Sequence, residues 1–329
     1  MCRTIKRLTT GMLFEDGGAM RPSRPAKSCK AYRKLNCECL TAMILSGMSS
    51  DLSNHPIGIL GLGIIGSRVA ERCRVAGLNV FVWNRTPREV SNFVRSPGEL
   101  AARAGILQIF VSDDAALAGV VAALLPALGA KHTVINSSTV SPDATHHAAG
   151  EVGKRGAVFL DCPFTGSKNA AAAGELTYYV GGPVERLEKI RWALEPSAKT
   201  ILPVGDVGHA TVLKIATNMI SATTVEILCE AMAVVAAHGV PLEKFAAAME
   251  HNACSSGLTR MKIPSILERD FEPHFSLKNM LKDARYAKAL AEQGGFEVPA
   301  LSAAAERMAG LVNERGEDDY SVLATHYLG

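Results

Sequence analysis

Between about residue 56 and residue 207, short apolar runs alternate with longer stretches of helical pattern. The strand-like runs are Ile57–Gly61, Asn79–Trp83, Leu107–Val111, His132–Asn136 and Val158–Asp161. Short apolar strands separated by helical segments are typical of βαβ units. The alternation predicts an α/β fold with a Rossmann-type, doubly wound parallel sheet, whose ligand site lies at the carboxyl ends of the strands.

The pattern changes to helix alone in the last third of the chain. From about Gly208 to His238 no proline interrupts a helical stretch, which stops at Gly239-Val-Pro241. Thirty helical residues span about 45 Å. This helix is apolar on most of its faces, so we expect much of it to be buried, in part by a partner subunit. We therefore predict a Rossmann-type domain over 56–207 and an all-α domain over 208–329 that begins with this interdomain helix.

The first 55 residues show no sustained period and mix basic residues with Gly, Pro and Ser. A mitochondrial transit peptide is one interpretation, but Glu15, Asp16 and Glu38 count against it, because transit peptides are poor in acidic residues. A basic arm is a second, although no run of like charges supports it. We favour an upstream start codon with the natural start at Met48, and expect a disordered or loosely ordered segment.

Composition and charge describe an ordinary globular body. Of 329 residues, 48% are hydrophobic and 20% are charged, and the formal net charge is +3. The first 55 residues hold nine Lys/Arg against four Asp/Glu, which leaves −2 for the remainder. The body is therefore close to neutral and carries no electrostatic footprint for nucleic acid.

Cysteine usage and hydropathy bear on the compartment. Eight cysteines are spread singly or, as in Cys37-Glu-Cys39, without the spacing of a zinc site, so we expect reduced thiols and no metal. We find no apolar run of bilayer-spanning length; Ala115–Ala130 comes closest, but Pro126 and Gly129 interrupt it. These features favour a cytoplasmic protein without a membrane partner.

A glycine motif follows the first predicted strand and opens a helix of about Ile64–Ala76. Its residues are Gly61, Leu62, Gly63, Ile64, Ile65 and Gly66. In a Gly-x-Gly-x-x-Gly fingerprint, the first glycine permits a tight turn and the second lets the backbone approach a pyrophosphate. The third allows close packing of helix on strand. Its place between strand and helix predicts a dinucleotide cofactor on the helix N-terminus.

The second strand ends in Asn84-Arg85-Thr86, where an acidic residue is expected if the ligand is the ribose 2′-hydroxyl of NAD. A guanidinium suits a 2′-phosphate instead, so we favour NADP over NAD. The alternative is a solvated turn.

Three further loops leave the strand ends and are rich in hydroxyls and backbone donors. They contain Val111-Ser112, Thr139, and Thr165-Gly166-Ser167 respectively. Each alone could be a helix-capping turn, because Ser, Thr and Asp are common N-caps. Their shared edge of the sheet makes them candidates for contacts with cofactor and substrate.

Lys214 and Asn218 lie one turn apart on the long helix and share a face. A fixed ammonium beside an amide could protonate an oxygen that becomes an alkoxide as hydride arrives. A surface lysine on an amphipathic helix is the alternative. The apolar neighbours Leu213 and Ile215 and the upstream fingerprint favour a reductase.

Together these motifs, with the late Lys282-Asp283, resemble those of the β-hydroxyacid dehydrogenase family over about residues 57–328. That family includes 3-hydroxyisobutyrate dehydrogenase, tartronate semialdehyde reductase and the glyoxylate/succinic semialdehyde reductases, and the likeness is greatest to the last branch. The resemblance implies Lys214 as the catalytic lysine, with Asn218 beside it. It implies that Thr139 contacts cofactor and substrate, and that Thr165 and the Gly166 backbone hold the substrate carboxylate.

The resemblance further implies that Phe275 and Asp283 line the pocket and that Lys282 touches the cofactor. The departures from the family pattern are Phe164-Thr165 in place of Val-Ser, Ala210 in place of a third glycine, and Val111-Ser112 in place of Leu-Pro. They preserve the chemistry and bear on the identity of the substrate.

Our leading hypothesis is therefore an NADPH-dependent reductase of small aldehyde acids, reversible as a hydroxyacid dehydrogenase, with Lys214 as proton donor. Alternatives are a 3-hydroxyisobutyrate dehydrogenase, an imine reductase, or a catalytically silent NADPH-binding module that serves as an interaction platform. The long apolar helix predicts a homodimer or homotetramer.

Overall fold

A computed structural model of the chain describes residues 55–329. The predictions made for residues 1–54, namely the extension, its start codon and its targeting alternatives, lie outside the described residues.

The described residues form one mainly parallel sheet with the order β2-β1-β3-β4-β5-β7-β6, and β8 pairs with β7. The strands are β1 Ile57–Leu60, β2 Val80–Trp83, β3 Ile106–Ile109, β4 Thr133–Asn136, β5 Val158–Asp161, β6 Phe164–Thr165, β7 Leu176–Gly181 and β8 Ala198–Gly205. The first five strands pair in parallel, so all their carboxyl ends meet at one edge. The predicted Rossmann-type α/β fold is confirmed.

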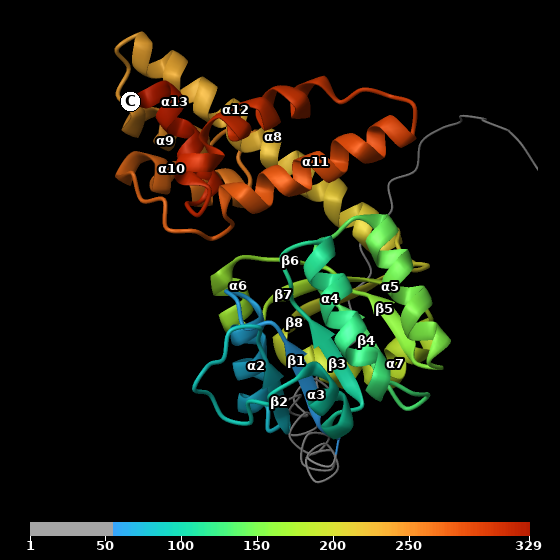
Figure 1. Cartoon of the computed structure of the whole chain (residues 1–329). Coiled ribbons are helices and arrows are strands. Elements are labelled where there is room, and N and C mark those ends of the chain that lie inside the picture. The colour runs from blue at the N-terminus through green and yellow to red at the C-terminus, as the bar shows by residue number, and fades with distance from the viewer. Residues whose placement is uncertain (1–54) are drawn as a thin grey trace, which may run out of the picture. The chain divides into compact units, whose positions relative to one another are not determined.

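Helices cover both faces of this sheet (Figure 1). They are α2 Gly66–Val75, α3 Pro97–Arg103, α4 Asp114–Leu124, α5 Pro142–Lys154, α6 Lys168–Ala173 and α7 Val184–Leu194. Successive strand side chains point to opposite faces. Ile59 accordingly packs in the cluster under α2 and α7, whereas its neighbour Leu60 packs in the cluster under α3, α4 and α5. Both faces are therefore apolar, as a buried parallel sheet requires.

Three strands, β6, β7 and β8, lie between Asp161 and Gly208, where the sequence analysis predicts no strand. β7 runs antiparallel to β5 and β6. Side chains along Leu176-Thr-Tyr-Tyr-Val180 alternate between buried and half-buried positions, and the aromatic and β-branched residues of this segment are typical of a strand. The ends of the predicted elements differ from the observed ends by one or two residues, as frayed termini usually do.

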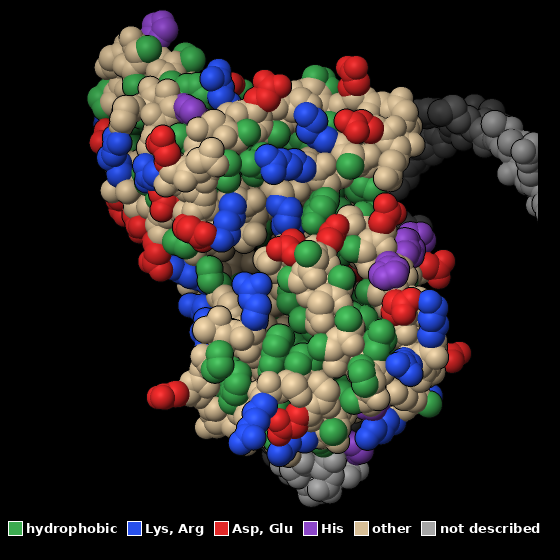
Figure 2. Space-filling view, viewed as in Figure 1, with side chains coloured by type: hydrophobic (Ala, Val, Ile, Leu, Met, Phe, Trp, Pro, Cys, Tyr) green, Lys and Arg blue, Asp and Glu red, His purple; other side chains and the backbone are tan. Residues whose placement is uncertain are grey.

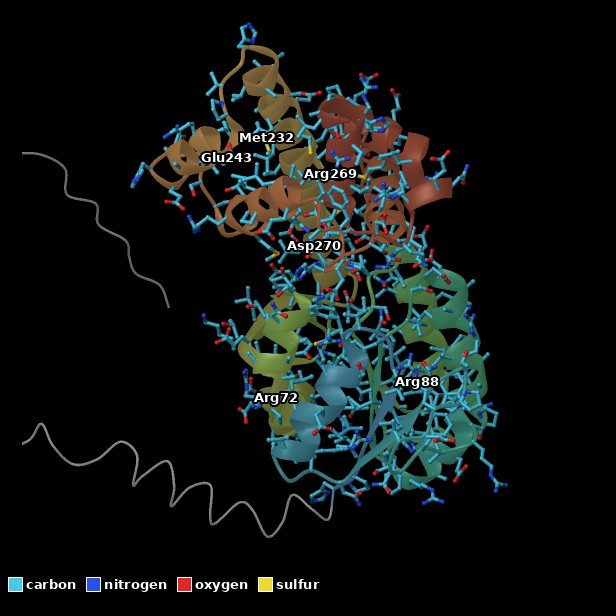
Figure 3. The ribbon with its side chains drawn as sticks, turned by 90° about the vertical axis from the view of Figure 1, so that its left-hand side faces the viewer. Arg72, Arg88, Met232, Glu243, Arg269 and Asp270 are labelled. Atoms are coloured by element: carbon cyan, nitrogen blue, oxygen red, sulfur yellow. The ribbon has the colours of Figure 1, made fainter. Side chains whose placement is uncertain are left out.

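After the sheet, every regular element in the described residues is helical, which confirms the all-α character of the C-terminal part. The elements are α8 His209–Ala237, α9 Leu242–Glu250, α10 Gly257–Glu268, α11 Leu277–Gln293, α12 Pro299–Arg315, the 3₁₀ turn η3 Tyr320–Ala324, and α13 Thr325–Leu328. Met232 of α8, labelled in Figure 3, is fully buried in the core that α8 shares with α11, α12 and η3. α8 is thus the central helix of this bundle.

α8 also corrects one expectation. It is long and apolar enough, by length and composition, to cross a membrane, so the statement that no run of that length exists was wrong. Yet α8 carries the buried polar residues Lys214, Asn218 and Glu226 and packs against three other helical elements. Polar groups of this kind are costly in lipid. In the single chain Ile220 is 65% and Val234 61% exposed, so part of the helix surface is not covered by the rest of the chain.

On the face shown in Figure 2, Lys and Arg side chains are interspersed with Asp and Glu, and neither sign forms a continuous patch. This distribution agrees with the near-neutral composition of the body after residue 55.

Candidate active site

The first turn of α8 is anchored to the sheet by Asp161, the last residue of β5. The Asp161 carboxylate is fully buried and accepts hydrogen bonds from Gly208 N (3.0 Å), Thr211 N (2.9 Å) and Thr211 Oγ1 (2.7 Å). It therefore caps α8 from about 50 residues away, satisfying N–H groups that a helix start leaves unpaired. Burial raises the pKa of Asp161, while these hydrogen bonds oppose that effect.

Because Asp161 holds the start of α8 against the sheet, it also fixes the position of the residues in the next turn of the helix. There Lys214 Nζ donates to Asn218 Oδ1 (2.9 Å), and Asn218 Nδ2 donates to Asp283 Oδ2 on α11 (2.6 Å). Asp283 also forms an ion pair with Lys282 (2.9 Å). Four residues predicted separately as catalytic, substrate-binding and cofactor-binding groups thus form one connected chain of polar contacts.

Burial dominates the electrostatics of this chain. Lys214 is only 9% exposed, and removal of its ammonium from water lowers the pKa of Lys214 to about 8. The Asp283 carboxylate raises this pKa and the Lys282 ammonium lowers it, both less strongly than burial acts. At neutral pH Lys214 is therefore still mostly protonated, but it is a much stronger acid than an exposed lysine.

The α11 face that bears Lys282 also contacts two loops at the sheet edge. Lys282 Nζ donates to the backbone oxygen of Thr139 and lies 5.0 Å from the centre of the Tyr286 ring. Tyr286 OH in turn donates to Asp114 Oδ1 (2.8 Å), which also accepts from Ser141 N (2.8 Å). Tyr286 and Asp114 were not predicted. Tyr286 could have been, because it follows Lys282 by one helical turn and shares its face.

The glycine fingerprint has the geometry of a dinucleotide cradle. Gly61 has φ +99°, and a Cβ there would lie 1.9 Å from the Phe110 oxygen. A Cβ on Gly66 would lie 2.0 Å from the Gly61 oxygen, so strand and helix touch at these positions. A Cβ on Gly63 would meet nothing within 4 Å. The open side at Gly63, at the start of α2, fits the approach of a pyrophosphate.

Asn84 supports this fingerprint. Its Oδ1 accepts from Leu62 N (2.9 Å), and its Nδ2 donates to the Thr86 oxygen (2.8 Å). The side chain thereby ties the turn after β1 to the loop after β2. Arg85 and Arg88 in that loop are exposed, and Arg88 is labelled in Figure 3.

Capping accounts for several of the hydroxyls at the strand ends. Asp113 caps α4 and receives a hydrogen bond from Ser112 Oγ (2.7 Å), which holds the pKa of Asp113 low. Ser141 and Ser167 cap α5 and α6. For the Ser167 and Asp113 loops the capping alternative thus describes the structure. Val111 N donates to Ser138 Oγ (2.8 Å), which joins the loops after β3 and β4.

Thr165 and Gly166 lie in and just after β6, at the same carboxyl edge. Gly166 has φ +136°, a backbone conformation that residues with a side chain rarely adopt, so this position favours glycine. The following Lys168 donates from Nζ to Glu272 Oε1 (2.5 Å), which links this loop to the segment before α11.

Phe275 is held in that segment by a buried ion pair. Phe275 N donates to Asp319 Oδ2 (3.2 Å), and Asp319 Oδ1 accepts from Lys262 Nζ (2.5 Å); both charged side chains are 2% exposed. The Phe275 ring packs edge-on against Tyr320, 6.3 Å between centres.

Two family descriptions match the chain. The NAD binding domain of 6-phosphogluconate dehydrogenase matches residues 56–205, and the NAD-binding domain of NADP-dependent 3-hydroxyisobutyrate dehydrogenase matches residues 208–327. Together they span both the sheet domain and the helical bundle.

Individual proteins are similar over most of their length. The chain is 26% identical to glyoxylate/succinic semialdehyde reductase 2 of Arabidopsis thaliana, over 87% of this chain and 85% of that protein. It is 29% identical to L-threonate dehydrogenase of Cupriavidus necator, over 81% and 94%. The structure of Mycobacterium tuberculosis 3-hydroxyisobutyrate dehydrogenase with L-serine superposes with a TM-score of 0.76 and 25% identity, covering 83% of this chain and 98% of that one.

Proposed function

Because the chain belongs to the β-hydroxyacid dehydrogenase family, whose members are NAD(P)-dependent oxidoreductases acting on CH–OH groups, we propose a narrower activity for it. The proposed reaction is NADPH-dependent reduction of a small aldehyde acid of the glyoxylate or succinic semialdehyde type, reversible as oxidation of the hydroxyacid. The observation that carries the proposal is the buried Lys214 ammonium, hydrogen-bonded to Asn218 and with its pKa lowered to about 8.

The chain's own residues supply binding and proton transfer, and the bound nicotinamide supplies the hydride. Lys214 Nζ donates its proton to the carbonyl oxygen as that oxygen becomes an alkoxide. Asn218 Oδ1 accepts from Nζ and so holds the ammonium in one orientation. Burial keeps water from competing for this proton and strengthens the interaction of the ammonium with the developing negative charge. In the oxidative direction, neutral Lys214 takes the proton from the hydroxyl.

Preference for NADPH is supported by the loop after β2. The residue directly after the strand is Asn84 and not an acid; its side chain accepts a hydrogen bond from Leu62 N, and the exposed Arg85 is available for a 2′-phosphate. Substitution of Arg85 by Ala should raise the KM for NADPH by about tenfold or more while leaving the KM for NADH nearly unchanged.

Initial rates test the proposed activity most widely. NADPH and NADH are each offered with glyoxylate, succinic semialdehyde, methylmalonate semialdehyde and tartronate semialdehyde, and a cyclic imine is included as a different substrate class. We expect NADPH oxidation with at least one of the first two acids. Activity confined to methylmalonate semialdehyde would favour the 3-hydroxyisobutyrate alternative, and activity on the imine alone the imine reductase. No oxidation with any of these would favour the silent NADPH-binding module.

We also propose that the protein is a homo-oligomer that buries one face of α8. Ile220, Ile227 and Val234 are 65%, 59% and 61% exposed and recur every seven residues, so they lie along one side of the helix. Exposed large aliphatic side chains aligned in this way are typical of a protein interface.

A further inference from the structure

Tyr286 on α11 contacts two parts of the candidate active site, but the proposed reaction gives it no role. It follows Lys282 by four residues, so both side chains lie on the same face of the helix. The Tyr286 side chain is half-buried, and its hydroxyl donates to Asp114 Oδ1 at 2.8 Å, although the two residues are 172 positions apart in the chain. This contact joins the helical bundle to the sheet domain.

The hydroxyl of Tyr286 joins three helices at one acceptor. Asp114 is the first residue of α4, and its Oδ1 also accepts from Ser141 N, the N-cap residue of α5 (2.8 Å). Burial raises the pKa of Tyr286 and the Asp114 carboxylate raises it further, so the phenol keeps its proton and remains the donor. Hydrogen bonds to a charged acceptor are strong. They fix α11 to the starts of α4 and α5, which follow β3 and β4 at the cofactor edge of the sheet.

The ring of Tyr286 lies beside the Lys282 ammonium. Lys282 Nζ is 5.0 Å from the ring centre, within the range of a cation–π interaction. The same ammonium donates to the Thr139 oxygen and forms an ion pair with Asp283 Oδ1 (2.9 Å). A free lysine side chain has many rotamers, and each of these contacts restricts them. The ring is therefore one of three contacts that hold the ammonium at the loop after β4.

We propose that Tyr286 is a positioning residue for the cofactor, which acts by holding Lys282 against the loop after β4. Its hydroxyl sets the place of α11 relative to that loop, and its ring restricts the Lys282 ammonium. A cation that is already in place loses less conformational entropy when the cofactor arrives, so the cofactor binds more tightly. The inference rests on the proposed function and on the cofactor contact expected of Lys282.

A purely structural link between the two domains is the alternative role for Tyr286. In that case, replacement of Tyr286 would weaken cofactor binding by the same factor whether or not Lys282 is present. If Tyr286 acts through Lys282, its replacement has an effect only while the ammonium is there. A double-mutant cycle on the two residues distinguishes the two roles.

Fluorescence titration with NADPH, in the absence of any aldehyde acid, measures the Kd for the cofactor in each variant. Lys282→Met should raise the Kd about tenfold, because it removes the ammonium. Tyr286→Leu should raise it about fivefold, and Tyr286→Phe, which keeps the ring, about threefold. In the Lys282→Met background, each Tyr286 substitution should change the Kd by less than about 1.5-fold.

Tyr327→Phe is the matched control. The Tyr327 hydroxyl also donates to a carboxylate, that of Glu226. Glu226 lies on α8 about 18 Å beyond Lys214, at about 1.5 Å per helical residue. Loss of this hydroxyl should leave the Kd for NADPH unchanged.

The outcome does not depend on the identity of the substrate, because none is present. A parallel series with NADH gives the same comparison if the preference for NADPH is wrong. The inference is wrong if Tyr286→Leu leaves the Kd unchanged, if it raises the Kd equally with and without Lys282, or if Lys282→Met has no effect. Melting temperatures verify that each variant is folded, and Tyr286→Phe provides the comparison if Tyr286→Leu does not fold.

Discussion

Three effects set the pKa of Lys214, and the two that lower it outweigh the one that raises it. Burial lowers its pKa most, Lys282 lowers it further, and Asp283 raises it. The resulting pKa of about 8 lies close to working pH, where a proton donor is most effective. Under the proposed mechanism reduction needs protonated Lys214, so kcat for reduction should be high below pH 8 and fall as the pH rises through that value. Oxidation needs the neutral form and should rise over the same range.

The two neighbours of Lys214 should move this profile in opposite directions. Asp283→Asn removes the charge that raises the pKa, so the decline in kcat for reduction should shift to lower pH. Lys282→Gln removes a charge that lowers it, so the decline should shift to higher pH. Profiles of kcat between pH 6 and 10 check both. Shifts in the same direction, or none in either variant, would contradict the electrostatic account of Lys214.

At the scale of an element, substitutions in the glycine turn should distinguish residues needed for folding from residues needed only for cofactor binding. A Cβ at Gly63 meets nothing in the protein, so Gly63→Ala should keep the melting temperature within a few degrees of the parent. The same methyl group occupies the surface that a pyrophosphate approaches, so the Kd for NADPH should rise about tenfold or more. Gly66→Ala, whose Cβ would lie 2.0 Å from the Gly61 oxygen, should lose stability as well. Unchanged NADPH affinity in Gly63→Ala would show that the turn does not hold the cofactor.

Asp161 connects β5 to the start of α8, and its removal should destabilise that end of the helix. Asp161→Ala leaves two backbone N–H groups and one hydroxyl without their buried acceptor, and should cost about 2–4 kcal/mol of unfolding free energy. Asp143→Ala, in the exposed first turn of α5, is the control and should cost less than about 1 kcal/mol. Urea denaturation measures both. Equal losses in the two variants would mean that Asp161 is not an essential cap.

Asp161 also shows which contacts a local sequence pattern cannot predict. The fingerprint, the parallel strands and the Lys214–Asn218 pair follow from local spacing, and each could be predicted. Asp161 reaches α8 across a chain separation of about 50 residues, and no local pattern records that pairing. Nor does spacing reveal that Asn218 bridges Lys214 to Asp283, because that contact depends on how α11 packs against α8.

At the scale of the whole molecule, the proposed homo-oligomer depends on the exposed side of α8. A homo-oligomer would have a molar mass that is a multiple of 34.9 kDa. Ile220→Asp should dissociate it, because a carboxylate buried at an apolar interface is strongly unfavourable. Val75→Asp is a matched control, since Val75 is 66% exposed on α2, away from this face. Light scattering after gel filtration distinguishes these outcomes, and a monomeric parent protein would exclude the proposed interface.

Replacement of Lys214 by Ala tests whether this lysine donates the proton. The turnover number for NADPH-dependent reduction of the best aldehyde acid is compared in the parent protein and in Lys214→Ala, together with the Kd for NADPH in each. Loss of the proton donor should lower kcat by about 100-fold or more, and the Kd should change less than about threefold. Near-normal turnover in Lys214→Ala would show that Lys214 is not the proton donor.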